Sequence, residues 1–393
     1  MRLLYRAAAA CKAWVAMPEA VRDNRLTVDL EAIAANLAAL RACLPPGTRV
    51  AGVVKADAYG HGLVPVARLL ETRGCEALAV AHLHEALTLR RAGLEGDIYL
   101  LLGIWPEEAP QAVEHRLTPV TEHLEVCQAL AAAGRSLGRA ATCQLKVDTG
   151  MGRLGLPPAR ALELLRRAAA LEGLTVTGLV SHLATAGEPG CPRAAAQARA
   201  FAGLLAQARR EGFPLPDSSL VGTGGALVPP PELPGPPGLA RLGVGLYGGL
   251  PSPGAAGRAR LTTAMRFTSR LLKVHRVPAG TRVSYGGTWV APADTWLGVV
   301  AAGYGDGYLR SLSNRGWMLV GDRRVPVRGR VCMNLTVVEL AQPLPMRGDE
   351  VVLLGAQGRD RITVDELADW AGTIPYEITC SLGAANPVTY LGA

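Results

Sequence analysis

The sequence predicts an α/β protein in which a (β/α)8 barrel of the TIM type is followed by a mostly β domain. From residue 26 to about residue 247, short apolar runs alternate with helical patterns. Stretches rich in Pro and Gly, 229–238 and 251–257, lie on either side of the last run, and beyond them helical patterns nearly vanish. We therefore expect a barrel domain at residues 25–257 and a β domain at residues 258–393, preceded by an extension at residues 1–24.

The barrel prediction rests on the number and order of its elements. The first helical pattern, 29–44, places Ile33, Leu37 and Leu40 on one face. Asp29 stands in position to cap this helix. Eight strand-like runs follow, at 50–54, 77–81, 97–102, 117–120, 142–147, 175–181, 219–222 and 239–245. Helical patterns lie between most of them, at 64–72, 83–92, 124–133, 159–171 and 193–211. Eight strands separated by helices are typical of a closed barrel, although a doubly wound open sheet would show the same alternation.

The expected β domain has short runs of Val, Thr and Leu between turns of Gly, Pro and Asp. These runs are 267–274, 296–301, 317–320, 335–340 and 350–354. Because this part of the chain switches from helical to strand patterns, we expect it to form a core of its own.

Composition narrows the class of protein. The formal charge of +8 comes from scattered arginines, basic runs are short and aromatic residues make up 5%, so we expect no nucleic-acid partner. No run approaches the roughly 20 apolar residues of a membrane helix, so we expect no membrane segment. The eight cysteines include no C-x-x-C pair, which favours a reduced, cytoplasmic protein without a metal site.

The first residues faintly resemble a signal peptide, with basic residues before an Ala-rich stretch. The apolar stretch is short and interrupted by Lys12. We therefore expect a disordered extension, or a start assigned too early with Met17 as the true first residue.

Lysine is scarce in this chain. Only Lys12, Lys55, Lys146 and Lys273 occur, and the other 37 of the 41 basic residues are arginine. Lys55 follows an apolar run and opens a turn bracketed by glycines, at 55–62. Lysines at strand ends are usually surface charges, but a primary amine at the end of a buried strand is also where a Schiff-base lysine belongs. This placement indicates pyridoxal phosphate (PLP) chemistry.

Further candidate site residues follow other expected strands. Lys146 and Arg153 follow the fifth run, and His182 ends the sixth. Glycine-rich segments, 222–226 and 241–248, follow the seventh run and form the eighth. Loops at these two places in a barrel often bind phosphate, since glycine exposes backbone N–H groups to an anion. Taken alone, His182 would more often be a core histidine, and any single arginine would be a surface charge.

These segments resemble those of alanine racemases, which are PLP enzymes of fold type III. The resemblance runs from about residue 25 to residue 390 and includes both expected domains. The motifs that carry it are Val-Val-Lys55-Ala-Asp-Ala-Tyr59-Gly-His-Gly, Lys146-Val-Asp-Thr-Gly-Met-Gly-Arg153-Leu-Gly, Ser181-His182, Arg241-Leu-Gly-Val-Gly-Leu-Tyr-Gly, Val283-Ser-Tyr285-Gly-Gly-Thr, Gly303-Tyr304-Gly-Asp-Gly-Tyr308, Val331-Cys-Met333 and Pro375-Tyr376-Glu-Ile-Thr-Cys380.

The resemblance implies a two-base mechanism. Lys55 would hold PLP covalently and transfer a proton on one face of the substrate, because inversion of a stereocentre needs an acid or base on each face. Tyr285 would be the second base and would reach the site from the partner subunit of a homodimer. A phenol is a poor base at neutral pH, so Tyr285 would need help through His182 and Arg241.

The resemblance also implies which residues bind the ligands. The residues that would hold PLP besides Lys55 are Tyr59, His182, Thr223, Arg241, Gly243, Val244 and Tyr376, with Arg241 facing the pyridine nitrogen. Arg153 and the backbone of Met333 would bind the substrate carboxylate. Lys146 resembles a lysine that family members can carbamylate, and Tyr304 and Tyr376 would narrow the pocket towards a small substrate such as alanine.

The chain departs from the family pattern at a few positions. The family usually has aspartate where this chain has Asn334, and Asn-Ser where this chain has Gly222-Thr223. The sequence therefore predicts an alanine racemase that supplies D-alanine for peptidoglycan, while Asn334 leaves a serine or broad-specificity racemase open. A fold type III decarboxylase would not need Tyr285 and would place an acidic residue at the position of Arg241. A non-catalytic PLP carrier would resemble only the barrel half.

Overall fold

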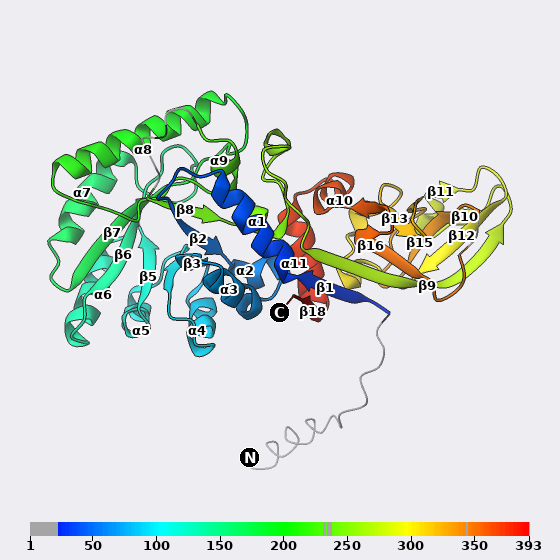
Figure 1. Ribbon diagram of the computed structural model, residues 1–393, viewed down its shortest axis with the longest axis horizontal. Helices are drawn as coiled ribbons and strands as arrows, with labels where there is room; N and C mark the ends of the chain where they lie inside the picture. The colour runs from blue at the N-terminus through cyan, green and yellow to red at the C-terminus, as the bar shows by residue number, and fades with distance from the viewer. Residues whose placement is uncertain (1–22, 231–232, 234–237, 343–344, 393) are drawn as a thin grey trace, which may run out of the picture.

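The structure, a computed structural model, describes residues 23–230, 233, 238–342 and 345–392. Figure 1 shows two lobes connected by the long strand β9 (Met265–Val277), with α1 (Leu30–Ala42) and α11 (Pro375–Ala385) between them. Apart from its last two residues, the expected extension at residues 1–24 lies outside the described residues. In the described part of the chain, no helix is both long and apolar enough to cross a membrane.

The first lobe is built on a parallel sheet. Among the described residues, seven strands are hydrogen bonded in the order β7-β6-β5-β4-β3-β2-β8, each parallel to its neighbour. They are β2 (Arg49–Val53), β3 (Ala77–Val80), β4 (Asp97–Leu100), β5 (Leu117–Thr121), β6 (Ala141–Lys146), β7 (Leu174–Val180) and β8 (Leu239–Leu242). Seven of the eight predicted runs are therefore strands. The last is shorter than predicted, because a 3-10 turn replaces its second half from Val244 onward.

The remaining predicted run, 219–222, closes the barrel without forming a regular strand. Ser219 pairs with Val180 of β7, and Gly222 pairs with Arg241 of β8, through isolated parallel bridges. The Ser219 N–H donates to the Leu179 carbonyl at 2.8 Å, and the Arg241 N–H donates to the Val221 carbonyl at 2.9 Å. A helix starts at Thr223, directly after this segment, so no longer ladder can form. The predicted (β/α)8 barrel is confirmed.

Helices cover the outside of the barrel (Figure 1). They are α3 (Leu63–Thr72), α4 (Leu83–Arg91), α5 (Ala109–Glu114), α6 (Leu124–Ser136), α7 (Pro158–Ala169), α8 (Pro192–Arg210) and α9 (Thr223–Leu227). In α1 the predicted face is buried, and the Asp29 carboxylate caps the helix by accepting from the Ala32 N–H at 3.0 Å. The sequence did not predict α5 and α9, because five or six residues are too short to show a helical period.

The second lobe is the predicted mostly β domain. In the described residues, nine strands form one sheet, and β10 (Arg282–Val283) pairs with β11 (Trp289–Val290) in a separate hairpin. The strands of the larger sheet that follow β9 are β12 (Thr295–Val300), β13 (Trp317–Val320), β14 (Arg323–Pro326), β15 (Thr336–Leu340), β16 (Glu350–Gln357), β17 (Asp360–Ile362) and β18 (Val388–Leu391). This lobe has its own hydrophobic cluster, which includes Phe267, Leu319 and Leu353.

Two helices of this lobe, α10 (Val364–Ala371) and α11, were not predicted. A capping box marks the start of α10, since the side chains of Thr363 and Glu366 each bind the other residue's backbone N–H. That signal was present in the sequence, but the strand-like runs that precede it, the last at 350–354, directed the prediction towards β structure.

The start of the described chain also belongs to this sheet. The strand β1 (Arg25–Asp29) pairs antiparallel with β9 and parallel with β18. The described part of the chain therefore starts in the second lobe's sheet and enters the barrel with α1. Residue 25, where the sequence placed the start of the barrel domain, lies in a strand of the other lobe's sheet.

The two lobes meet closely at two glycines. The segment after β2, labelled α2 (Lys55–Gly60), packs against α11. A Cβ atom on Gly60 would overlap the Thr379 carbonyl oxygen, and one on Gly383 would overlap the backbone of Gly60. This contact places α11 directly beside the segment that contains Lys55.

We expect Gly60→Ala to lower the free energy of unfolding by about 1–3 kcal/mol more than Gly74→Ala, because only the first adds a Cβ to a packed contact. The two glycines have almost the same φ, 78° and 79°, but a Cβ at Gly74 would meet open space. Urea unfolding of both variants measures the difference. Equal losses would mean that the contact between α2 and α11 contributes little.

Candidate active site

Lys55 lies at the carboxyl end of β2 and begins an unusual turn. Its next four residues, Ala56 to Tyr59, have φ between 53° and 56°, the left-handed region that costs a non-glycine residue roughly 1–2 kcal/mol. The Ala58 N–H donates to the Val54 carbonyl at 2.8 Å. The Asp57 carboxylate accepts from the Leu63 N–H at 2.6 Å. The backbone around Lys55 is therefore held in one strained conformation, which is often a feature of functional sites.

The carboxylate of Glu85 holds the same turn, and the sequence did not single it out. It accepts from the Ala56 N–H at 2.7 Å and from the N–H groups of Ala81 and His82 at 2.8 and 3.0 Å. Glu85 stands three residues after His82, the position of a capping glutamate at the start of α4. This spacing was the available signal, but nothing local connects it to Lys55.

Tyr59 is buried between aromatic rings beside the loop that follows β8. Its ring centroid lies 4.9 Å from that of Tyr247 and 5.7 Å from that of Tyr376 on α11. Burial raises the pKa of Tyr59, so its phenol keeps its proton and can donate a hydrogen bond. A Cβ on Gly243 would lie 2.6 Å from the Tyr59 hydroxyl oxygen, so a larger residue there would displace the Tyr59 ring.

The glycine-rich segments after the seventh and eighth positions of the barrel lie against each other. The Thr223 hydroxyl accepts from the Gly243 N–H at 3.0 Å and from the Gly245 N–H at 3.5 Å. Val244 lies in the same loop, and Pro375, at the start of α11, packs beside it around Gly249. The Tyr59 and Thr223 hydroxyls and the backbone of the glycine-rich loop thus lie close together, an arrangement that suits a phosphate.

Lys55, Lys146, Arg153 and Arg241 lie close enough together for their charges to affect the pKa values of the two lysines. Burial, followed by the charge of Arg153, lowers the pKa of Lys55, and Glu85 acts in the opposite direction. Burial also lowers the pKa of Lys146 to about 7, with further lowering by Arg241 and Arg153. These groups make the site electrostatically suited to anions, and Lys146 is partly neutral near physiological pH.

Arg241 and His182 form a buried pair. Arg241 Nη2 donates to the Ser181 carbonyl at 2.6 Å and lies 3.4 Å from His182 Nδ1. Burial lowers the pKa of His182 to about 3 and that of Arg241 to about 10, so the imidazole is neutral and the guanidinium is charged at pH 7. Arg241 Nη1 is a buried donor with no partner among the described residues. A ring nitrogen of a bound ligand would satisfy it.

The predicted residues of the second lobe form a separate, exposed group. Tyr285, Met333 and Tyr304 are 71%, 58% and 43% exposed. The Tyr304 N–H donates to the Cys332 carbonyl at 3.0 Å, and the side-chain amide of Asn334 donates to Asp306, two residues after Tyr304, at 3.2 Å. These contacts hold the segment of Met333 and Asn334 beside the turn that begins at Tyr304.

Within one chain, Tyr285 does not meet Lys55. Tyr285 lies between β10 and β11, at the end of the second lobe farthest from the barrel (Figure 1). The structure therefore brings the predicted residues together in two sets. The barrel set contains Lys55, Tyr59, Lys146, Arg153, His182, Thr223, Arg241, Gly243, Val244 and Tyr376. The β-lobe set contains Tyr285, Tyr304, Met333 and Asn334.

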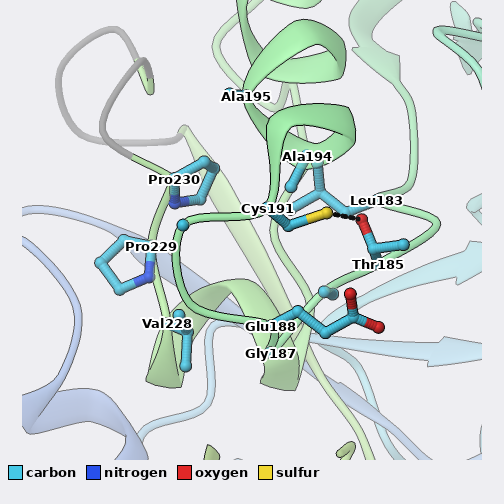
Figure 2. A pocket seen from close by; sticks show the side chains of 12 residues that line it. Leu183, Thr185, Gly187, Glu188, Cys191, Ala194, Ala195, Val228, Pro229 and Pro230 are labelled. Atoms are coloured by element: carbon cyan, nitrogen blue, oxygen red, sulfur yellow. Dashed lines mark hydrogen bonds between the residues drawn. The ribbon is translucent and has the colours of Figure 1, made fainter. Parts of the chain in front are cut away.

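A small cavity lies between residues 183–195 and residues 228–230, and none of these site residues lines it (Figure 2). Thr185, Cys191 and Pro230 are among its lining residues, and the Cys191 thiol donates to the Thr185 hydroxyl at 3.0 Å. Its volume of about 110 Å³ is below the range of about 300–1,000 Å³ that is usual for ligand sites. The barrel set, and not this cavity, is the candidate active site.

The fold and the barrel set define a class of protein, a barrel enzyme with a reactive lysine at a strand end and an anion site beside it. Comparison with known proteins gives the family. The chain matches the N-terminal domain of alanine racemase over residues 28–251 and the C-terminal domain over residues 264–390. It belongs to the alanine racemase family, whose members are isomerases.

Individual relatives agree with this assignment. The alanine racemase of Syntrophobacter fumaroxidans is 39% identical over 357 residues, which are 91% of this chain and 94% of the relative. The crystal structure of alanine racemase from Streptomyces lavendulae has a TM-score of 0.89 and 38% identity, covering 95% of this chain and 98% of that one. The structure from Bartonella henselae, described with covalently bound pyridoxal phosphate, has a TM-score of 0.83 and 27% identity, covering 94% and 99%.

We expect Lys146 to make the protein more stable as the pH rises. Below about pH 7 both the native and the unfolded chain carry its proton; between about 7 and 10.5 only the unfolded chain binds it. Relative to Lys146→Met, the free energy of unfolding should rise by up to about 1.4 kcal/mol per pH unit in this window. Urea unfolding at pH 7 and pH 9.5 in bicarbonate-free buffer measures the rise. Lys273→Met, which removes an exposed lysine, is the control and should leave the pH dependence of the wild type unchanged.

Proposed function

We propose that this protein is an alanine racemase that interconverts L-alanine and D-alanine with PLP bound through Lys55. The observation that carries the proposal is the convergence of Lys55, the Arg241 donor that has no partner in the described part of the chain, and the glycine-rich anion site at the mouth of the barrel. This convergence occurs in a chain that matches the racemase family over both domains. A carrier protein that resembles the barrel alone is therefore disfavoured.

The residues of the barrel set suit each chemical group of PLP, namely its phosphate and its ring nitrogen. The Tyr59 and Thr223 hydroxyls, the backbone of Gly243 and Val244, and Tyr376 would hold the phosphate. Arg241 Nη1 would donate to the ring nitrogen, and its guanidinium keeps its proton because its pKa stays near 10. The neutral imidazole of His182 accepts from Arg241 Nη2 and fixes its orientation. Bound PLP withdraws electrons from the substrate and makes the Cα–H bond acidic.

Two side chains would move the proton. The amine of Lys55, with its lowered pKa, accepts or returns a proton on one face of the substrate Cα. A second group must act on the opposite face, since a single base returns the proton to the side that it left. Tyr285 would be that group, supplied by the second lobe of a partner subunit, because its own chain holds it far from the barrel (Figure 1).

Substrate binding would use both sets. Arg153 and the Met333 N–H would bind the substrate carboxylate, and Tyr304 would restrict the side chain that fits. Lys146, whose amine is partly neutral near pH 7, would react with carbon dioxide and lose a proton to form a carbamate. The resulting negative charge would lie near Arg153 and hold its guanidinium.

We also propose the wider setting of this activity. The enzyme is a cytoplasmic homodimer that supplies D-alanine for peptidoglycan, and its two domains divide near residue 257, with β1 (Arg25–Asp29) joined to the domain of residues 258–393. Asn334 favours one second candidate, a racemase that also accepts serine. The side-chain amide of Asn334 donates to the Asp306 carboxylate, whereas an aspartate at position 334 would be repelled by it. Asp306 lies two residues after Tyr304, so the difference lies beside the residue that would restrict the substrate side chain. Rates on alanine, serine and lysine distinguish the two candidates.

We expect Tyr285→Phe to reduce kcat by about 10²–10⁴-fold, the usual contribution of one acid or base group. We assign Tyr285 to removal of the Cα proton of L-alanine and Lys55 to that of D-alanine, so solvent deuterium incorporation at Cα should fall selectively for L-alanine. Tyr308→Phe is the control, because Tyr308 is a buried tyrosine of the same lobe whose hydroxyl has no partner among the described residues. A wild-type protein that binds PLP but exchanges neither enantiomer would refute the alanine assignment.

Mixing two inactive variants tests the shared site. We expect Lys55→Ala and Tyr285→Phe to be almost inactive alone and to recover up to about a quarter of wild-type activity after subunit exchange. In random exchange half of the dimers are hybrids, and each hybrid has one site with both wild-type residues. No recovery, with hybrids demonstrated by differently tagged subunits, would place Lys55 and Tyr285 in the same chain's site.

A further inference from the structure

Glu85 is a buried carboxylate that connects two strand ends of the barrel. Its side chain comes from α4, and the residue is 7% exposed. One oxygen accepts from the Ala56 N–H, directly after Lys55, and the other accepts from the Ala81 and His82 N–H groups after β3. A carboxylate that accepts three backbone N–H groups in a buried place is held firmly, since each bond to a charged acceptor is stronger than a neutral one.

The turn after Lys55 needs such a support. Four consecutive non-glycine residues have left-handed φ, and this conformation persists only where surrounding contacts impose it. Glu85 binds the first of these residues, Ala56, and the Asp57 side chain binds the Leu63 N–H at the other end. The Glu85 contact is the one adjacent to Lys55, so it determines the direction of the backbone where the chain leaves β2 at Lys55.

Glu85 also contributes charge to the surroundings of Lys55. Burial, Arg153 and Arg241 disfavour the protonated amine, and Lys146 and His182 are further basic neighbours. Glu85 favours the protonated amine, together with a smaller contribution from Cys380 on α11. Other polar residues that line the same cavity as Glu85, between α2, α4 and α11, are Asp57, His84 and Thr88.

We propose that Glu85 is a positioning residue for Lys55: it clamps the left-handed turn to the end of β3 and balances the positive charge around the amine. The proposal deepens the function proposed above, in which Lys55 holds PLP and moves the proton. In this role Glu85 acts through the backbone next to Lys55 and through the charge on its amine, and it takes no part in proton transfer itself.

The small number of lysines makes the amine of Lys55 directly observable. Full-length protein labelled with [ε-13C]lysine contains only four labelled residues, and Lys55→Ala assigns the signal of Lys55. We expect Glu85→Gln, which removes the charge but keeps a side chain of the same length, to lower the titration midpoint of Lys55 by about one pH unit. Glu85→Asp keeps the charge and should retain most of the wild-type midpoint. This titration needs no cofactor, so its outcome does not depend on whether the protein is a racemase.

Glu76→Gln is the matched control. Glu76 also accepts a backbone N–H of β2, that of Val50 at 2.8 Å, but at the opposite end of the strand from Lys55. The Glu76→Gln variant should be less stable, because it loses the ion pair with Arg41, and the titration midpoint of Lys55 should be unchanged. Equal Lys55 midpoints in the wild type, Glu85→Gln and Glu76→Gln would overturn the proposal and leave Glu85 as a helix cap only.

The holoenzyme gives a second readout of position. With PLP bound, Glu85→Asp should release the cofactor on dialysis at least tenfold faster and lower kcat more than it changes KM, because the shorter side chain cannot reach both strand ends. Wild-type PLP retention and kcat in Glu85→Asp would overturn the clamp.

If Glu85→Gln does not fold, Glu85→Asp still tests the clamp. If the wild type binds no PLP, the proposed function fails, whereas the titration still tests the link between Glu85 and Lys55.

Discussion

The strained turn between Lys55 and Gly60 is the feature on which the rest of the site depends. Residues of L chirality avoid left-handed φ, so this conformation must be imposed by neighbours on several sides. Glu85 binds its first residue from the barrel side, and α11 packs on its last residue through paired glycine backbones. The barrel alone therefore does not complete the surroundings of Lys55, because one wall comes from a helix of the second lobe.

The need for contacts from both lobes around this turn explains why the chain crosses between the lobes more than once. The strand β1 lies in the second lobe's sheet, α1 covers the barrel, and α11 returns to the mouth of the barrel before β18 pairs with β1. The arrangement places Tyr376 against Tyr59 in the same chain. It also directs Tyr285, on the hairpin at the far end of the second lobe, away from its own barrel and towards solvent.

Electrostatics determines what the barrel set can bind. Several basic groups are gathered where burial disfavours their charge, which lowers the pKa values of Lys55, Lys146 and His182. Such a cluster is costly without anions, and a phosphate and a carboxylate would offset that cost. Lys146 can lower it further by losing its proton, since its pKa lies near 7, whereas Arg241 stays charged and keeps a donor free for a ligand.

The sequence by itself determined the class of fold and most members of the barrel set. Short strands and amphipathic helices leave local periodic patterns, and Lys55, Thr223 and Arg241 lie in distinctive motifs that contain glycines. Only the tertiary structure decided that residues 219–222 form bridges, that β1 joins the second lobe, and that Glu85 meets the turn of Lys55. These features depend on contacts between segments that are far apart in the chain, and such contacts leave no local pattern in the sequence. The same is true of burial, which lowers the pKa of Lys146.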